Sequence, residues 1–247
     1  MKEAREHHFR LKNPRGQELA CVLHGELGPR VVVGCHGMLS SKDSRKLVRL
    51  SRSLPPAGLP LLRFDFAGRG ESQGSLYDLS ISHEVEDLAS VLDWLGTQGV
   101  QRVGLYGSSL GGAVALLAAA RDERVIAIAT IAALAHPELM GERNPDYEKA
   151  WLEQGALETH DGPIGRGFYD DALQHDVLSA VAILRCPLLV IHGTGDTVVP
   201  CSDSHDIAAT AREARLELID GGDHELNQET VLRPLVREVT SFFAERV

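Results

Sequence analysis

Short apolar runs alternate along the chain with stretches of helical periodicity. Several of the runs are continuous Val, Ile and Leu, which is typical of strands buried on both faces of a parallel sheet. Strand-like runs occur at Glu18–Glu26, Val31–Cys35, Leu61–Phe66, Val103–Tyr106, Val125–Ile131, Leu188–His192 and Leu216–Ile219. Helix-like stretches occur at Ser41–Leu54, Ile81–Leu95, Gly111–Arg121, Asp176–Ile183, Ser204–Ala211 and Val231–Arg246. This alternation predicts an α/β fold, in which helices cover both faces of a mostly parallel twisted sheet.

Two segments depart from the alternation. Near the N-terminus, His8–Leu11 and Glu18–Glu26 flank the turn signal Asn13-Pro14-Arg15-Gly16, which predicts an antiparallel hairpin at the edge of the sheet. Residues 135–174 mix Pro, Gly, aromatic and charged residues and contain no buried strand pattern. Because a structureless loop of that length is uncommon in a compact domain, we predict a small helical cap here. The alternative is a surface excursion without substrate contact. The core then comprises residues 1–134 and 175–247.

Composition narrows the class of protein. A chain of 247 residues with 43% hydrophobic and 24% charged residues fits one soluble domain. The net charge of −10 argues against nucleic acid and anionic membranes as partners. The polar start Met1–His8 is unlike a signal peptide, and the four cysteines form no C-x-x-C pair. These features predict a cytoplasmic protein with reduced thiols, and they leave open whether it is a monomer or a homodimer.

The segment Gly107-Ser108-Ser109-Leu110-Gly111 is the strongest functional signal. It follows a strand-like run and precedes an Ala- and Leu-rich helix pattern. This is G-x-S-x-G in a strand–turn–helix setting, the nucleophile elbow, in which a tight turn presents the serine at the carboxyl end of a sheet. A second match, Gly70-Glu71-Ser72-Gln73-Gly74, runs into a loop instead of a helix. The context therefore selects Ser109 over Ser72 as the nucleophile.

A nucleophilic serine needs a base and a group that orients the base. In this topology the acid and then the histidine follow the serine, each on a loop after a strand. Asp196 follows the run Leu188–His192, and His224 follows Leu216–Ile219 in a Gly-rich loop. We therefore predict Ser109, Asp196 and His224 as a catalytic triad. Asp196 in Gly-x-Gly-Asp also suits a turn, while the alternative acids are Asp223, beside His224, and Asp170 and Asp171 in the insertion.

Five motifs in order carry a resemblance to the α/β-hydrolase superfamily over nearly the whole chain. They are His36-Gly37-Met38, Asp65-Phe66-Ala67-Gly68-Arg69-Gly70-Glu71-Ser72, Gly107-Ser108-Ser109-Leu110-Gly111-Gly112, His192-Gly193-Thr194-Gly195-Asp196 and Gly222-Asp223-His224. Within the superfamily, Phe64–Ser72 and Glu84–Leu88 resemble compact bacterial esterases of the cinnamoyl/feruloyl esterase and serine-aminopeptidase-like group. The resemblance implies an α/β-hydrolase fold and a structural loop around Ser72. It also implies an oxyanion hole formed by the backbone N–H groups of Leu110, after the nucleophile, and Met38.

The resemblance implies a serine esterase that acts on a small-molecule ester through an acyl-enzyme, without metal or organic cofactor. In the feruloyl group a small insertion holds an aromatic acyl group, so we expect Trp151, Phe168 and Tyr169 to be available for substrate binding. Cap aromatics also form small cores of their own. Thioesterase, monoacylglycerol lipase and aminopeptidase activities are the nearest alternatives. A non-catalytic small-molecule receptor is the alternative from another class, because fold alone does not fix function.

Overall fold

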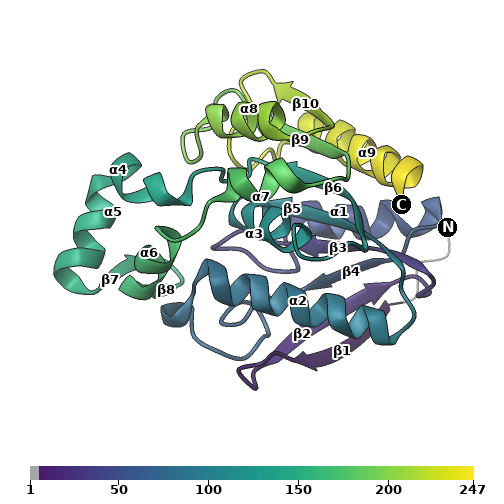
Figure 1. Ribbon diagram of the computed structural model, residues 1–247, viewed down its shortest axis with the longest axis horizontal. Coiled ribbons are helices and arrows are strands. Elements are labelled where there is room, and N and C mark those ends of the chain that lie inside the picture. The colour runs from purple at the N-terminus through teal and green to yellow at the C-terminus, as the bar shows by residue number, and fades with distance from the viewer. Residues whose placement is uncertain (1–5) are drawn as a thin grey trace.

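A twisted central sheet organises the protein, and the computed structural model describes it within residues 6–247 (Figure 1). The polar start of the chain, where no signal peptide is predicted, lies partly outside the described residues. Within them the sheet has eight strands in the order β1-β2-β4-β3-β5-β6-β9-β10. The strands are β1 (Glu6–Lys12), β2 (Glu18–His24), β3 (Arg30–Cys35), β4 (Leu61–Phe64), β5 (Arg102–Ser108), β6 (Val125–Ile131), β9 (Leu188–Gly193) and β10 (Ala214–Ile219).

The strands from β4 to β10 run parallel, as their continuous apolar sequences predict. Strands β1 and β2 form the predicted antiparallel hairpin, and β2 pairs antiparallel with β4. The hairpin closes at Gly16, whose φ of 79° favours glycine and whose N–H donates to the Asn13 carbonyl at 2.9 Å. Because parallel strands share one carboxyl edge, the loops after β3, β5, β9 and β10 meet at the same edge of the sheet.

Helices cover both faces of the sheet and enclose two apolar cores (Figure 1). Helices α1 (Arg45–Ser53) and α9 (Glu229–Arg246) pack on one face. On the other face lie α2 (Ile81–Thr97), α3 (Leu110–Ala119), α7 (Val177–Ile183) and α8 (Cys201–Thr210). All ten residues of α3 are buried, which suits its small and apolar sequence. Two single 3₁₀ turns, η1 (Pro55–Ala57) and η2 (Leu76–Asp78), complete the loops around β4.

The segment between β6 and α7 folds into a cap that lies to one side of the sheet (Figure 1). Its elements are η3 (Pro137–Leu139), α4 (Met140–Arg143), α5 (Pro145–Lys149), the π-helical turn η4 (Ala150–Gln154), β7 (Ala156–Thr159), β8 (Gly162–Gly165) and α6 (Arg166–Ala172). Short helices make up most of this segment, and in addition β7 and β8 form an antiparallel hairpin that the sequence pattern does not predict. Four-residue strands that contain Gly and Pro carry no alternation of apolar and polar residues, so their pattern escapes detection.

The cap has an aromatic core of its own. Trp151 and Phe168 are fully buried, and Trp151 stacks on Tyr169 with ring centroids 5.5 Å apart. The Trp151 indole N–H donates to the Ile164 carbonyl at 3.1 Å, which ties the π-helical turn to β8. A buried aromatic group of this kind, with its polar atom satisfied, gives a small segment a defined shape.

Several polar contacts fasten the cap to the core. Arg143 binds both carboxylate oxygens of the buried Asp203, at 2.8 and 3.0 Å. Asp161, in the turn between β7 and β8, accepts from the Arg69 guanidinium at 2.6 Å. Asp171 accepts from the backbone N–H of Ser82 at 3.0 Å, at the N-terminus of α2. The bidentate pair and the helix-end contact give geometric specificity, so they define the seating of the cap.

No helix in the described part of the chain is both long and apolar enough to cross a bilayer. All four cysteines fall within residues 6–247, and none of them forms a disulfide. Cys21, Cys35 and Cys186 are buried, and burial raises the pKa of each of these thiols above its ordinary value.

Candidate active site

Ser109 sits in a strained turn between β5 and α3. Its φ of 54° and ψ of −124° lie outside the regions that a non-glycine residue ordinarily adopts. The turn is possible because the residues two positions before and two positions after Ser109, Gly107 and Gly111, are glycines. A Cβ on Gly107 would lie 2.4 Å from the Gly111 carbonyl oxygen, and a Cβ on Gly111 would lie 2.2 Å from the His36 carbonyl oxygen. This is the geometry of a nucleophile elbow, as the motif predicts.

The sheet edge brings Ser109, His224 and Asp196 into one hydrogen-bonded line. His224 Nε2 lies 3.1 Å from Ser109 Oγ, and His224 Nδ1 lies 2.7 Å from Asp196 Oδ2. A carboxylate only accepts, so Nδ1 carries the ring proton and Nε2 accepts from the serine hydroxyl. A base that accepts from the hydroxyl in this way can take its proton when the oxygen attacks a substrate.

Glycines allow the loops of Asp196 and His224 to approach each other. A Cβ on Gly193 would lie 2.2 Å from the Gly222 carbonyl oxygen. That same oxygen accepts from the Gly195 N–H at 2.9 Å. Asp223 accepts from the Leu226 N–H at 2.7 Å, so it shapes the His224 loop, and the structure does not place it as the orienting acid. Asp170 and Asp171 lie on α6 of the cap and are not in this line either.

Asp196 is held by four donors. One carboxylate oxygen accepts from the backbone N–H groups of Val198 and Val199 at 2.8 and 3.0 Å. The other accepts from His224 at 2.7 Å and His192 at 3.1 Å. Burial by itself raises the pKa of Asp196, but these hydrogen bonds outweigh it and hold the pKa well below its usual range. Asp196 therefore stays ionised and can stabilise a protonated His224.

Free backbone N–H groups lie beside the serine. Within residues 6–247, the N–H groups of Met38 and Leu110 have no hydrogen-bond acceptor. The loop of Met38 is fixed by His36, whose Nε2 accepts from the Phe66 N–H at 3.1 Å and whose Nδ1 donates to the Gly37 carbonyl at 2.8 Å. A fully hydrogen-bonded, buried ring of this kind is structural. Free donors next to a nucleophile suit a developing oxyanion.

A cavity of about 470 Å³ opens onto Ser109 and His224. The remaining residues that line it come chiefly from the loop Gly37–Ser40, the start of α1, the loop after His224, and Val198. One cap residue also lines it, His160, which lies in the turn between β7 and β8. Nothing in the sequence singles out His160, because its position depends on a hairpin that the pattern does not reveal.

The expectation that Trp151, Phe168 and Tyr169 bind substrate is not met by their positions. None of the three lines the cavity at Ser109, and all are buried in the core of the cap. Their apolar surface is used within the cap, since a segment this short has few other large residues with which to form a core. The Tyr169 hydroxyl instead donates to Glu148 at 2.5 Å.

Ser72, in the second G-x-S-x-G match, has a structural role. Its hydroxyl donates to the Asp65 carbonyl at 2.6 Å and accepts from the Ala20 N–H at 2.8 Å. The hydroxyl therefore uses its hydrogen as a donor and its oxygen as an acceptor within the fold, and these two bonds tie the loop after β4 to β2. The resemblance to the α/β-hydrolase superfamily implied this structural role.

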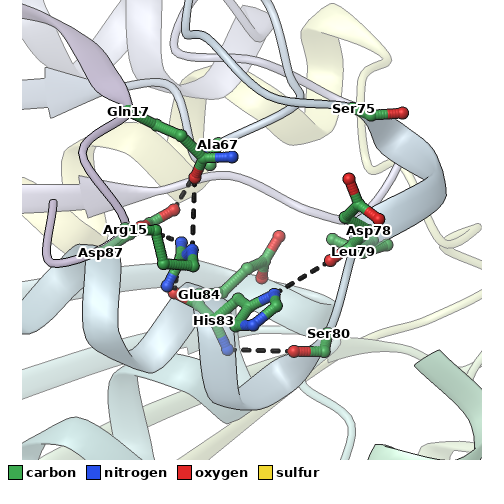
Figure 2. Close-up of a pocket in the computed structure, with 10 residues that line it drawn as sticks. All are labelled: Arg15, Gln17, Ala67, Ser75, Asp78, Leu79, Ser80, His83, Glu84 and Asp87. Atoms are coloured by element: carbon green, nitrogen blue, oxygen red, sulfur yellow. Dashed lines mark hydrogen bonds and ion pairs between the residues drawn. The ribbon is translucent and has the colours of Figure 1, made fainter. Parts of the chain in front are cut away.

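A second cavity, of about 170 Å³, lies beside the N-terminus of α2 and away from Ser109 (Figure 2). Figure 2 shows the Glu84 side chain pointing into the space between Arg15, Ala67 and Leu79. Within the described residues, neither carboxyl oxygen of Glu84 has a hydrogen-bond partner. Burial, and then the nearby Asp87, raise the pKa of Glu84 well above its usual value. None of the residues that line this cavity belongs to the hydrogen-bonded line of Ser109, His224 and Asp196, so the cavity is separate from that site.

The fold agrees with comparisons to known proteins. A model of the alpha/beta hydrolase family matches residues 31–237. The chain belongs to the α/β hydrolase family. Mouse palmitoyl-protein thioesterase ABHD10, a mitochondrial protein, is 30% identical over 212 residues, which cover 81% of this chain and 70% of that one.

Solved structures show the same architecture. Alpha/beta hydrolase domain-containing protein 10 from mouse superposes with a TM-score of 0.82 at 25% identity, covering 97% of this chain and 99% of that one. Est1E from Butyrivibrio proteoclasticus, solved with ferulic acid bound, has a TM-score of 0.82 at 21% identity, covering 96% and 98%. At that identity the likeness to Est1E establishes the fold alone.

Proposed function

We propose that this protein is a serine hydrolase that cleaves carboxylic esters through an acyl-enzyme. One observation carries the proposal: the continuous line of hydrogen bonds from Ser109 Oγ through His224 to the buried carboxylate of Asp196. Such a line is the minimum that a serine needs to act as a nucleophile near neutral pH. Its position at the floor of a cavity gives a substrate access to it.

In the proposed acylation, Ser109 Oγ attacks the ester carbonyl carbon while its proton moves to His224 Nε2. The carbonyl oxygen becomes an oxyanion, and the N–H groups of Met38 and Leu110 stabilise it. Asp196 stabilises the imidazolium and keeps the ring in its orientation. When the intermediate collapses, His224 returns the proton to the departing alkoxide, so the alcohol leaves and Ser109 carries the acyl group.

Deacylation repeats the steps with water. His224 Nε2 takes a proton from a water molecule, whose oxygen attacks the acyl carbonyl. The second oxyanion collapses, the proton passes to Ser109 Oγ, and the carboxylic acid leaves. No step requires an electron transfer.

For the substrate we propose esters of small or aromatic acids. The cavity of about 470 Å³ has Ser40, Ser44, Arg45 and Lys46 in its wall, so much of the wall is polar. A long alkyl chain would leave such groups without water and without partners, which is unfavourable. Cleavage of thioesters is the second candidate. It is supported by the likeness to the mouse palmitoyl-protein thioesterase over most of the chain, and the same acyl-enzyme would serve it.

The test compares initial rates on p-nitrophenyl esters from acetate to palmitate, on methyl ferulate and on palmitoyl-CoA. Ser109→Ala and Ser72→Ala are measured beside the wild type. We expect turnover that falls with acyl length, and its loss by several orders of magnitude in Ser109→Ala. Ser72→Ala, which also removes a serine from a G-x-S-x-G match, should retain the active-site chemistry.

Equal activity of the wild type and Ser109→Ala would refute the nucleophile. A preference for palmitoyl-CoA over every oxygen ester would replace the ester proposal with the thioester one. A folded wild-type protein inactive on all these substrates would favour an amide substrate or the receptor alternative, and a ligand-induced rise in melting temperature would identify the latter.

A further inference from the structure

His192 is a buried histidine that the proposed mechanism does not use. It lies in β9, one residue before the strand ends, and its side chain has no exposed surface. Its Nε2 lies 3.1 Å from Asp196 Oδ2 and 3.1 Å from the Val199 carbonyl oxygen. Its Nδ1 lies 2.6 Å from the hydroxyl of Ser204, a buried residue of α8. Every polar atom of the ring therefore has a partner.

These partners define the tautomer of His192. A carboxylate and a carbonyl only accept, so Nε2 must carry the hydrogen and share it between them. Nδ1 then accepts from the Ser204 hydroxyl, which is free to rotate its proton towards the ring. The Ser204 hydroxyl thus binds Nδ1, on the opposite side of the ring from Asp196, and favours the tautomer that can donate to Asp196.

The hydrogen bonds close a small ring around Asp196. Val199 donates its N–H to Asp196 and accepts from His192 through its carbonyl. His192 in turn donates to Asp196. The loop between β9 and α8 is therefore fixed at both polar groups of Val199, and the Asp196 carboxylate cannot rotate without breaking contacts on either side.

We infer that His192, held by Ser204, is a positioning residue for the catalytic acid, and this inference rests on the proposed function. His192 shares the oxygen of Asp196 that also accepts from His224. It therefore fixes the direction in which Asp196 holds His224. It also withdraws charge from that oxygen, which limits how strongly the carboxylate stabilises a protonated His224.

A small number of titratable groups lie near His224 and Asp196. Lys46, Glu225 and His160 line the cavity with His224, and Cys201 of α8 lies near Asp196. Lys46 donates to the Glu225 carbonyl at 2.5 Å and lies 3.5 Å from the Glu225 carboxylate, so their charges largely offset each other. Asp223, which precedes His224 in the same loop, accepts from the Leu226 N–H at 2.7 Å. Asp196 is the carboxylate that is hydrogen-bonded to His224, at 2.7 Å, so a change at His192 acts on His224 through it.

The test uses His192→Phe, which fills the volume without a donor, and His192→Gln, whose side-chain amide can donate at the place of Nε2. In His192→Phe we expect kcat to fall by about 10²-fold with KM nearly constant, as misplacement of a catalytic group does. The acidic limb of the kcat/KM profile should move to higher pH, because Asp196 then holds the imidazolium proton more tightly. His192→Gln should recover most of kcat, and Ser204→Ala should lie between the two.

Leu232→Ala, which removes buried apolar contact on α9, is the control for lost stability alone. It should lower the melting temperature without moving the pH limb. The inference is overturned if His192→Phe keeps its kcat, if its activity falls with no shift of the limb, or if Gln is as damaging as Phe. If Ser109→Ala and Asp196→Asn also leave activity intact, the proposed function itself has failed.

Discussion

Asp196→Asn tests the orientation of the base more sharply than any other single change. The substitution keeps the size of the side chain and replaces one carboxylate oxygen with an NH₂ group. The oxygen that faces the N–H groups of Val198 and Val199 can stay in place. The NH₂ group then faces two ring nitrogens that both carried hydrogens, His192 Nε2 and His224 Nδ1.

That arrangement sets donor against donor at 2.7 Å on the His224 side. His224 relieves the conflict by moving its proton from Nδ1 to Nε2, after which Nδ1 accepts from the amide. Nε2–H then points at Ser109 Oγ and cannot take the serine proton. With the geometry kept and the tautomer wrong, we expect kcat to fall by about 10⁴-fold. This factor corresponds to about 5.4 kcal/mol of lost transition-state stabilisation.

The assay is kcat on p-nitrophenyl acetate at pH 7.5, with melting temperature measured on the same samples. Asp170→Asn serves as the matched control, because Asp170 is an exposed residue of α6. Within the described residues its ion pair is with Arg166, on the same helix. It should retain wild-type activity. If Asp196→Asn loses less than about tenfold while remaining folded, the tautomer reasoning is wrong and another acid orients His224.

Three further predictions concern other parts of the molecule. Because burial raises the pKa of Glu84, the folded protein keeps its proton while the unfolded chain ionises, so stability is lost as pH rises above about 4.5. Glu84→Gln should therefore melt higher than the wild type at pH 8 with a smaller gain at pH 4.5, and a gain independent of pH would contradict this. Gly111→Ala places a Cβ 2.2 Å from the His36 carbonyl oxygen, so kcat/KM should fall at least about 10²-fold; Gly167→Ala, where a Cβ meets nothing within 4 Å, should be silent. Trp151→Phe removes the indole donor to the Ile164 carbonyl and fills less of the cap's core, so thermal unfolding should show a loss of about 2 kcal/mol. A changed acyl-length preference would instead place Trp151 in substrate binding.

Much of the core could be predicted because its signals are local and strong. Continuous Val, Ile and Leu runs mark β3, β6 and β9, and the small residues after β5 mark the elbow. Strand ends are harder to predict. The run Leu61–Phe66 is mostly apolar, but β4 ends at Phe64, and the next residue, Asp65, accepts from the Lys42 ammonium at 3.0 Å. Hydrophobicity records burial, and Phe66 is buried without being in a strand.

Some features of the site follow from the order of residues along the chain, and others depend on the packing of the folded protein. Ser109, Asp196 and His224 each follow a strand, so their meeting at one edge follows from the parallel sheet. His192 lies inside an apolar run, where a histidine is indistinguishable from a strand residue until Ser204 of α8 is packed against it. The aromatic residues of the cap were predicted to face substrate because size alone does not tell a core residue from a binding residue. Their burial against each other depends on the hairpin that the sequence pattern did not show.

The way the cap attaches to the core affects how related proteins can acquire different substrate specificities. The whole cap is one uninterrupted piece of chain that leaves the core after β6 and returns at α7, between Ser109 and Asp196 in sequence. It brings its own core around Trp151 and touches the cavity through His160. Such a segment can be exchanged as one unit. Another insert can replace it without moving Ser109, Asp196 and His224, provided that it keeps partners for the buried Asp203 and for Arg69. New specificities could then arise by recombination at two junctions instead of by many point substitutions.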